Sequence, residues 1–176
     1  GVGKTTTAVN LSACLAVKNK KVLVIDIDPQ GNTTSGFGVD KNSVKNSIYD
    51  VIINEIPIQD TLIETMIKKL HLSPSNINLA GAEVELVSVI SRETRLKYAL
   101  EDIKDNYDFI IIDCPPSLGL LTINALTAAN TLLVPIQCEY YALEGLSQLM
   151  NTVKMIQKHL NKDLRVEGVV LTMFDA

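Results

Sequence analysis

The first six residues, Gly1-Val2-Gly3-Lys4-Thr5-Thr6, place glycines, a lysine and threonines ahead of an apolar run with helical spacing. Glycines let backbone N–H groups point at an anion, and the N-terminus of the following helix adds partial positive charge. In this setting Lys4 can reach the β- and γ-phosphates of a nucleotide, and the Thr5 hydroxyl can ligate Mg²⁺. The stretch therefore predicts a site for a magnesium nucleoside triphosphate. The alternative is a glycine-rich loop that merely caps a helix.

Two acidic strand ends offer carboxylates for the same chemistry. The run VLVID ends at Asp26, with Asp28 two residues further on, and FIIID ends at Asp113. The i, i+2 spacing puts Asp26 and Asp28 on the same side of an extended chain, at a strand end where ligands bind in parallel sheets. Two roles fit this pair: contact with the outer shell of Mg²⁺, and orientation of an attacking water. The plainer alternative is a solvated turn carboxylate.

Asp113 matches the Walker B pattern, in which a carboxylate after an apolar strand coordinates Mg²⁺, usually through water. Four apolar residues followed by an aspartate are common in buried strands, so this segment alone is weak evidence. Its combination with GKTT, at a separation typical of one domain, favours a nucleotide site. Pro115 and Pro116 stiffen the following loop, where a γ-phosphate sensor fits.

Alternating helical and strand patterns must hold these residues in place. Helices are expected at 4–18, 47–54, 60–69 and 143–160, with one or two in 81–106 and another after 115–119. Strands are expected at 22–26, 109–113, 131–137 and 166–174, a strand running into a loop at 70–75, and turns at 28–38. The runs 22–26 and 109–113 are apolar up to their last residue, as in strands buried on both faces. This alternation predicts an α/β fold: a parallel sheet with helices on both faces.

The composition indicates an ordinary globular protein. With 176 residues, 47% of them hydrophobic and 20% charged, the chain is long enough to bury a core. A net charge of −4 excludes nucleic-acid binding by bulk charge, so a DNA contact would need a local patch. No apolar run has the length of a membrane span, and no secretion signal is seen. Cys14, Cys114 and Cys138 predict reduced, buried thiols, and the isolated His71 and His159 suggest neither catalysis nor metal binding.

A complete phosphate cradle has the form G-x-x-x-x-G-K-[ST] and follows a strand. The sequence begins inside this pattern and ends soon after an expected strand. Residues 1–176 are therefore expected to form a single partial domain that lacks its first strand and its C-terminal part. In a parallel sheet the strand before such a loop is normally central, so its loss should expose two unpaired strand edges.

Several segments together resemble one family, the ParA/Soj branch of the ATPases with a deviant Walker A motif. They span nearly the whole chain and include GVGKTTTAVNLSACLA, VLVIDIDPQGNTTSGFG, SPSN…LAGAEVEL, FIIIDCPPSLGLLTINAL and VPIQCEYYALEGLSQL. The resemblance implies a P-loop NTPase fold with ATP and Mg²⁺ as cofactors. It also implies a set of nucleotide-binding residues: Gly1, Val2, Gly3, Lys4, Thr5 and Thr6.

The resemblance further implies individual roles. Lys4 and Asp28 would be the catalytic residues, with Lys4 holding the phosphates and Asp28 orienting the hydrolytic water. Thr5, Asp26 and Asp113 would be the metal residues. In that set Thr5 would be the direct Mg²⁺ ligand, Asp26 its neighbour in the metal shell, and Asp113 the Walker B aspartate.

For the whole protein, the resemblance implies an ATP-dependent homodimer in chromosome or plasmid partitioning. Slow ATP hydrolysis would switch the dimer on and off non-specific DNA, and a centromere-binding partner of the ParB type would stimulate it. The expected location is the cytoplasm, on the nucleoid, with no membrane partner. The family's signature lysine would stand two positions before Gly1, and DNA-contact residues and the rest of the adenine pocket, approached by 173–175, would follow Ala176. The chain alone is therefore expected to have no useful ATPase activity.

Three alternatives remain open. The nearest is a membrane-associated positioning ATPase of the MinD type, which shares the site but ends in a lipid-binding helix. The second is an enzyme or carrier on the same fold, such as a ligase resembling dethiobiotin synthetase or an electron carrier resembling nitrogenase reductase. The third is a binding module that recognises DNA or a protein without hydrolysing ATP.

Overall fold

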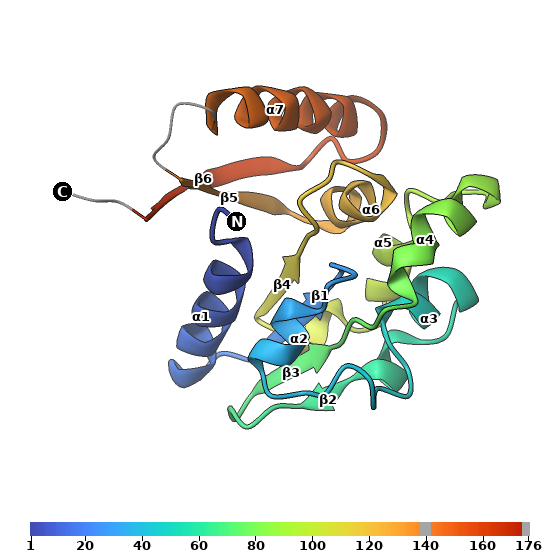
Figure 1. The fold of residues 1–176 in the computed structure, drawn as a ribbon, viewed down its shortest axis with the longest axis vertical. Coiled ribbons are helices and arrows are strands. Elements are labelled where there is room, and N and C mark those ends of the chain that lie inside the picture. The colour runs from blue at the N-terminus through green and yellow to red at the C-terminus, as the bar shows by residue number, and fades with distance from the viewer. Residues whose placement is uncertain (138–141, 174–176) are drawn as a thin grey trace.

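The computed structural model describes residues 1–137 and 142–173 (Figure 1). Helices and strands alternate along the chain as α1 (Lys4–Val17), β1 (Val22–Asp26), α2 (Asn32–Gly36), α3 (Ile48–Asn54), β2 (Ile63–Glu64), β3 (Leu70–Ser73), α4 (Leu79–Glu85), α5 (Arg95–Leu100), β4 (Phe109–Asp113), α6 (Leu120–Ala128), β5 (Thr131–Gln137), α7 (Ala142–His159) and β6 (Arg165–Thr172). Short 3₁₀ turns cover Ile58–Thr61, Leu86–Ser88 and Lys104–Asn106. The predicted α/β class is confirmed.

The strands form two sheets. The larger has the order β2-β3-β1-β4, in which β1 runs parallel to β3 and β4 while β2 is antiparallel to β3. The smaller contains the parallel pair β5 and β6. In the register of β1 with β4, Asp26 lies opposite Asp113. The ends of two strands distant in sequence therefore bring two of the predicted site residues together.

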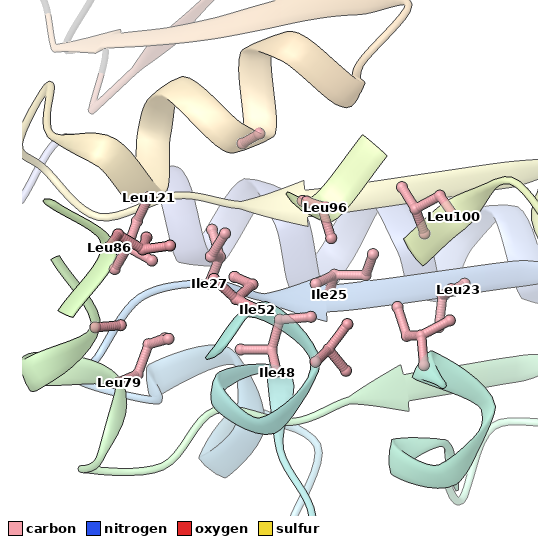
Figure 2. Close-up of a cluster of buried hydrophobic side chains, with 14 of the residues drawn as sticks. Leu23, Ile25, Ile27, Ile48, Ile52, Leu79, Leu86, Leu96, Leu100 and Leu121 are labelled. Carbon is pink, nitrogen blue, oxygen red and sulfur yellow. The ribbon is translucent and has the colours of Figure 1, made fainter. Parts of the chain in front are cut away.

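Strand β1 is buried at every position because both faces of its sheet are covered. Leu23 and Ile25 point into an apolar cluster formed with α3, α4, α5 and α6, as Figure 2 shows. Val22 and Val24 point to the opposite face and pack in a cluster that includes Ala16 of α1. This alternation is the period of an extended chain, and it confirms the prediction of helices on both faces. It also fixes β1, so the loop after Asp26 starts from a rigid support.

The two sheets are separate, with the pair β5 and β6 lying beyond β4 beneath α7 (Figure 1). Within residues 1–137 and 142–173, β4 has a strand partner on the β1 side alone, and β5 is paired with β6 alone. These are the two unpaired edges that the sequence predicted. The expectation that 109–113 is fully buried was wrong, since Phe109 is 42% exposed and Asp113 is the one fully buried residue of the strand.

Other local predictions need correction. Residues 60–69 do not form a helix, because Ile63–Glu64 pair with β3. A turn at Thr65–Lys69, in which Lys69 has φ 68°, then leads directly into that strand. The segment 28–38 is not turn throughout, since it contains α2, whose threonines bond to the carboxylates at the ends of β4 and β1.

The cysteines differ in their surroundings. Cys14 is exposed, contrary to the prediction, whereas Cys114 is partly buried. Burial raises the pKa of Cys114 to about 12, as expected for a thiol packed against apolar groups. Cys138 lies outside the described residues, and so do residues 174–176. The latter include the last residue of the strand predicted at 166–174 and part of the segment predicted to approach the adenine pocket. Of the helices described, none has the length and apolar character needed to cross a bilayer.

Candidate functional site

The phosphate-loop segment begins α1 as predicted. Gly3 is the N-cap residue, with a left-handed backbone at φ 85°, and no side chain caps the helix there. A β-carbon on Gly3 would lie 3.2 Å from the Thr172 side chain of β6, so space as well as backbone angle favours glycine. The first-turn N–H groups have no partner within the helix itself. They therefore suit an anion at this end of α1.

Asp113 joins two segments that approach it from different parts of the chain. Its Oδ2 accepts hydrogen bonds from the Thr5 hydroxyl at 2.9 Å and from the Thr33 hydroxyl at 2.6 Å. Thr5 belongs to the first turn of α1 and Thr33 to α2, so one carboxylate ties both helix starts to the end of β4. The predicted metal residues Thr5 and Asp113 are thus in direct contact.

The electrostatic surroundings of Asp113 include the other predicted residues. Burial raises the pKa of Asp113, and the hydrogen bonds from Thr33 and Thr5 oppose this. The Asp28 carboxylate raises the same pKa further, while the Lys4 ammonium lowers it. Lys4, Thr5, Asp28 and Asp113 therefore lie close enough to interact. The structure brings these four residues to one location.

Asp26 is fully buried, and its carboxylate accepts from the loop that follows β1. Oδ2 accepts from the Thr34 backbone N–H at 2.8 Å and from the Thr34 hydroxyl at 2.7 Å, and Oδ1 accepts from the Asp28 N–H at 3.2 Å. Burial raises the pKa of Asp26 to about 6, since the desolvation of the charge outweighs these hydrogen bonds. Asp26 therefore holds the loop, and its place in a magnesium shell stays a prediction.

Asp28 is 8% exposed and lies in the loop between β1 and α2. Its Oδ1 accepts from the Gln30 N–H at 2.9 Å, in a turn closed by the Gly31 N–H to the Asp28 carbonyl at 2.9 Å. The same carbonyl accepts from the Ser75 hydroxyl at 2.7 Å. The loop is thus well braced around the residue predicted to orient water.

Three hydroxyl residues of this network were missed by the sequence analysis: Thr33, Thr34 and Ser75, all fully buried. Buried hydroxyls need hydrogen-bond partners, and here those partners are Asp113, Asp26 and Asp28. The available signal was the pair of adjacent threonines directly after DPQGN, which was interpreted as part of a turn.

The residues present fit magnesium bound with a nucleotide. Among the described residues there is no cluster of three or more His, Cys, Asp or Glu side chains that could hold a metal ion by itself. Mg²⁺ rarely uses such a cluster; it keeps several waters and binds through one or two protein oxygens plus substrate phosphates. The Thr5 hydroxyl and the Asp113 carboxylate, 2.9 Å apart at an uncapped helix start, are oxygens of that kind.

Comparison with known proteins extends these observations. The sequence model of an AAA domain family matches residues 1–166. The chain is 62% identical over 176 residues to the sporulation initiation inhibitor protein Soj of Bacillus subtilis, which is 100% of this chain and 70% of Soj. It is 53% identical over 176 residues to the chromosome partitioning protein ParA of Myxococcus xanthus, covering 100% of this chain and 62% of that protein.

A solved structure shares the fold closely. Cobyrinic acid a,c-diamide synthase from Mycobacterium smegmatis, with bound ATP analog and magnesium, has a TM-score of 0.96 and 40% sequence identity, covering 100% of this chain and 72% of that one. Its fold agrees with the alternation of helices and strands seen here. From the AAA domain match, the identity to Soj and ParA over the whole chain, and the grouping of Lys4, Thr5 and Asp113, the chain belongs to the ParA/Soj family of partitioning ATPases.

Proposed function

We propose that this chain binds Mg-ATP and contains residues that hydrolyse it, as part of a protein that partitions chromosomes or plasmids. The observation that carries the proposal is the Asp113 carboxylate, which accepts from Thr5 and Thr33 and interacts with Lys4 and Asp28. In this proposal residues 1–176 form a single partial domain of the nucleotide-binding fold. The ATP analogue and magnesium in the M. smegmatis structure support the choice of ligand.

Each residue has a chemical task in this proposal. Lys4 pairs with the β- and γ-phosphates, and the N–H groups from Gly1 to Thr6 surround them. Bound Mg²⁺ supplies charge neutralisation at the phosphates; Thr5 would contact it directly, and Asp26 and Asp113 would lie in its outer shell. Asp28 would orient the attacking water; its carboxylate lies close enough to Asp113 to raise the pKa of that group.

The same geometry suits a nucleotide-dependent switch. The segment 27–34, which ends in the first turn of α2, is joined to Asp113 through Thr33, and the loop 114–119 follows Asp113 directly. A γ-phosphate beside these segments would order them together. We propose that the ordered loops pack two copies of the protein into a dimer that binds DNA non-specifically on the nucleoid, in the cytoplasm. A ParB-type centromere-binding partner would then stimulate hydrolysis and release the dimer.

The test separates binding from turnover in the full-length protein. Asp28→Ala should retain Mg-ATP affinity and lose hydrolysis, because it removes the group that orients water. Lys4→Ala should weaken nucleotide binding, because it removes a phosphate contact. The matched control is Asp105→Ala, a 3₁₀-turn carboxylate outside the network, which should change neither property. Undiminished turnover in Asp28→Ala would refute the assigned role, and absence of Mg-dependent ATP turnover in the wild type would refute the function.

A second candidate is a ligase that uses ATP to activate a carboxylate. It is favoured by the TM-score of 0.96 to cobyrinic acid a,c-diamide synthase. Such an enzyme would turn over ATP in response to a carboxylate acceptor and an amine donor, whereas a partitioning ATPase would respond to DNA and its protein partner. Assaying wild-type turnover with each addition distinguishes the two.

A further inference from the structure

Two buried hydroxyl residues, Thr34 of α2 and Ser75 just after β3, form a hydrogen-bonded link behind Asp28. Both residues are fully buried. The Ser75 N–H donates to the Thr34 hydroxyl at 3.0 Å, and that hydroxyl donates to Asp26 Oδ2 at 2.7 Å. The Thr34 hydroxyl thus acts as acceptor and donor at once, which no apolar side chain of the same shape can do.

The link closes around the backbone of Asp28. The Asp28 N–H donates to Asp26 Oδ1 at 3.2 Å, and the Asp28 carbonyl accepts from the Ser75 hydroxyl at 2.7 Å. Both backbone polar groups of Asp28 are therefore held, one from β1 and the other from the end of β3. The remaining freedom of the residue lies mainly in its side chain, which the Gln30 N–H restrains further at 2.9 Å.

We propose that Thr34 and Ser75 are positioning residues that fix the loop carrying Asp28, and that ATP turnover depends on this link more than ATP binding does. The inference rests on the proposed function of Asp28. In the proposed site the phosphates are bound by Lys4, Thr5 and the start of α1, whereas Asp26, the carboxylate bonded to Thr34, would lie only in the outer shell of Mg²⁺. Losing the link would leave the phosphate contacts in place while the water-orienting carboxylate moves out of alignment, and misplacement by about 1 Å can lower a rate about 100-fold.

The variants form a matched set in the full-length protein. Thr34→Val keeps the shape of the side chain but removes the hydroxyl, whereas Thr34→Ser keeps the hydroxyl. Ser75→Ala removes the donor to Asp28. The control is Thr61→Val, which removes another buried hydroxyl, one that donates to the Ile58 carbonyl at 2.8 Å and contacts the Ser73 hydroxyl at 2.7 Å rather than Asp26 or Asp28.

The measurements are kcat for ATP and the Kd for Mg-ATP, with thermal unfolding as a check on folding. We expect kcat to fall at least about tenfold in Thr34→Val and Ser75→Ala while Kd changes less than about twofold. A fall in kcat without a change in Kd indicates an interaction that acts in the transition state and not in binding. Thr34→Ser should recover most of the activity. Thr61→Val should lower thermal stability and keep kcat. If Thr34→Val does not fold, Ser75→Ala carries the test.

Three results would overturn the inference: wild-type kcat in Ser75→Ala, equal activity of Thr34→Ser and Thr34→Val, or a fall in kcat for Thr61→Val as large as for the other two. Each would show that the hydroxyl link does not act through Asp28. A wild-type protein without Mg-dependent turnover is a separate outcome, because it would refute the proposed function from which the inference starts.

Discussion

The buried carboxylate of Asp26 predicts a defined dependence of stability on pH. Its pKa is raised from 3.8 to about 6 in the folded protein, first through desolvation, with Asp113 adding repulsion. In the unfolded chain the group ionises near its ordinary value. Folding must therefore bury a charge at neutral pH but not at acid pH. The stability that Asp26 contributes is fully present below pH 3.8 and is lost as the pH rises through about 6.

The magnitude follows from the shift. The interval from 3.8 to about 6 corresponds to about 3 kcal/mol at about 1.4 kcal/mol per pKa unit. Asp26→Asn keeps the size of the side chain and removes the ionisation. The free energy of unfolding of wild type should therefore fall relative to the variant by about 2–3 kcal/mol between about pH 4 and pH 7.

The assay is urea unfolding of nucleotide-free protein at several pH values, for wild type and Asp26→Asn in parallel. Taking the difference between the two proteins removes the titration of other groups, and this difference is the quantity to follow. The absolute stability of the variant is less informative, since an amide cannot accept all the hydrogen bonds that Asp26 accepts from Thr34 and Asp28. Parallel pH curves for the two proteins would refute the reasoning that burial dominates at Asp26.

Further predictions concern the supports of the site. Ser47→Ala removes the hydroxyl that accepts from the Tyr49 N–H in the capping box of α3, and should lower the free energy of unfolding by about 1 kcal/mol. Unchanged denaturation would show that this cap is dispensable. Gly119→Ala would put a β-carbon 2.1 Å from Glu83 Oε1, displacing the carboxylate that accepts from the Leu121 N–H at the start of α6. The expected loss is up to about 1 kcal/mol, with little added by Glu83→Ala in the double variant, whereas additive losses would indicate independent effects. Gly3→Ala forces a left-handed backbone on alanine and should weaken Mg-ATP binding in a titration; wild-type affinity would argue against a phosphate loop.

The strands and helices that carry the site could be predicted from local sequence because their patterns are unambiguous. The run 22–26 is apolar and β-branched up to Asp26, and it is buried on both faces as expected. The run 109–113 has the same pattern but lies at a sheet edge, and local sequence does not reveal which strands lie beside it. For the same reason the helical spacing at 60–69 was misleading, since pairing of Ile63 with β3 decides the conformation there.

In the candidate site, too, some residues could be predicted from local sequence and others depend on contacts made in the folded chain. Lys4, Thr5, Asp28 and Asp113 were predicted because their residue types, at a helix start or after a strand, have a known chemistry, and they lie together. The roles of Thr33 and Thr34 could not be predicted, because their partners Asp113 and Asp26 are reached through the folded chain. A threonine pair in a loop has no distinctive local pattern. Its importance follows from burial, which leaves a hydroxyl dependent on its hydrogen-bond partners.

The most direct measurement is the magnesium dependence of ATP binding in the full-length wild type and in Asp113→Asn. If Thr5 and Asp113 hold Mg²⁺ beside phosphates bound by Lys4, added Mg²⁺ should tighten ATP binding in the wild type. The variant should lose at least about tenfold of that gain, equal to about 1.4 kcal/mol, while its affinity for ATP without Mg²⁺ should be retained. An identical gain from Mg²⁺ in both proteins would contradict a shared site formed by these residues.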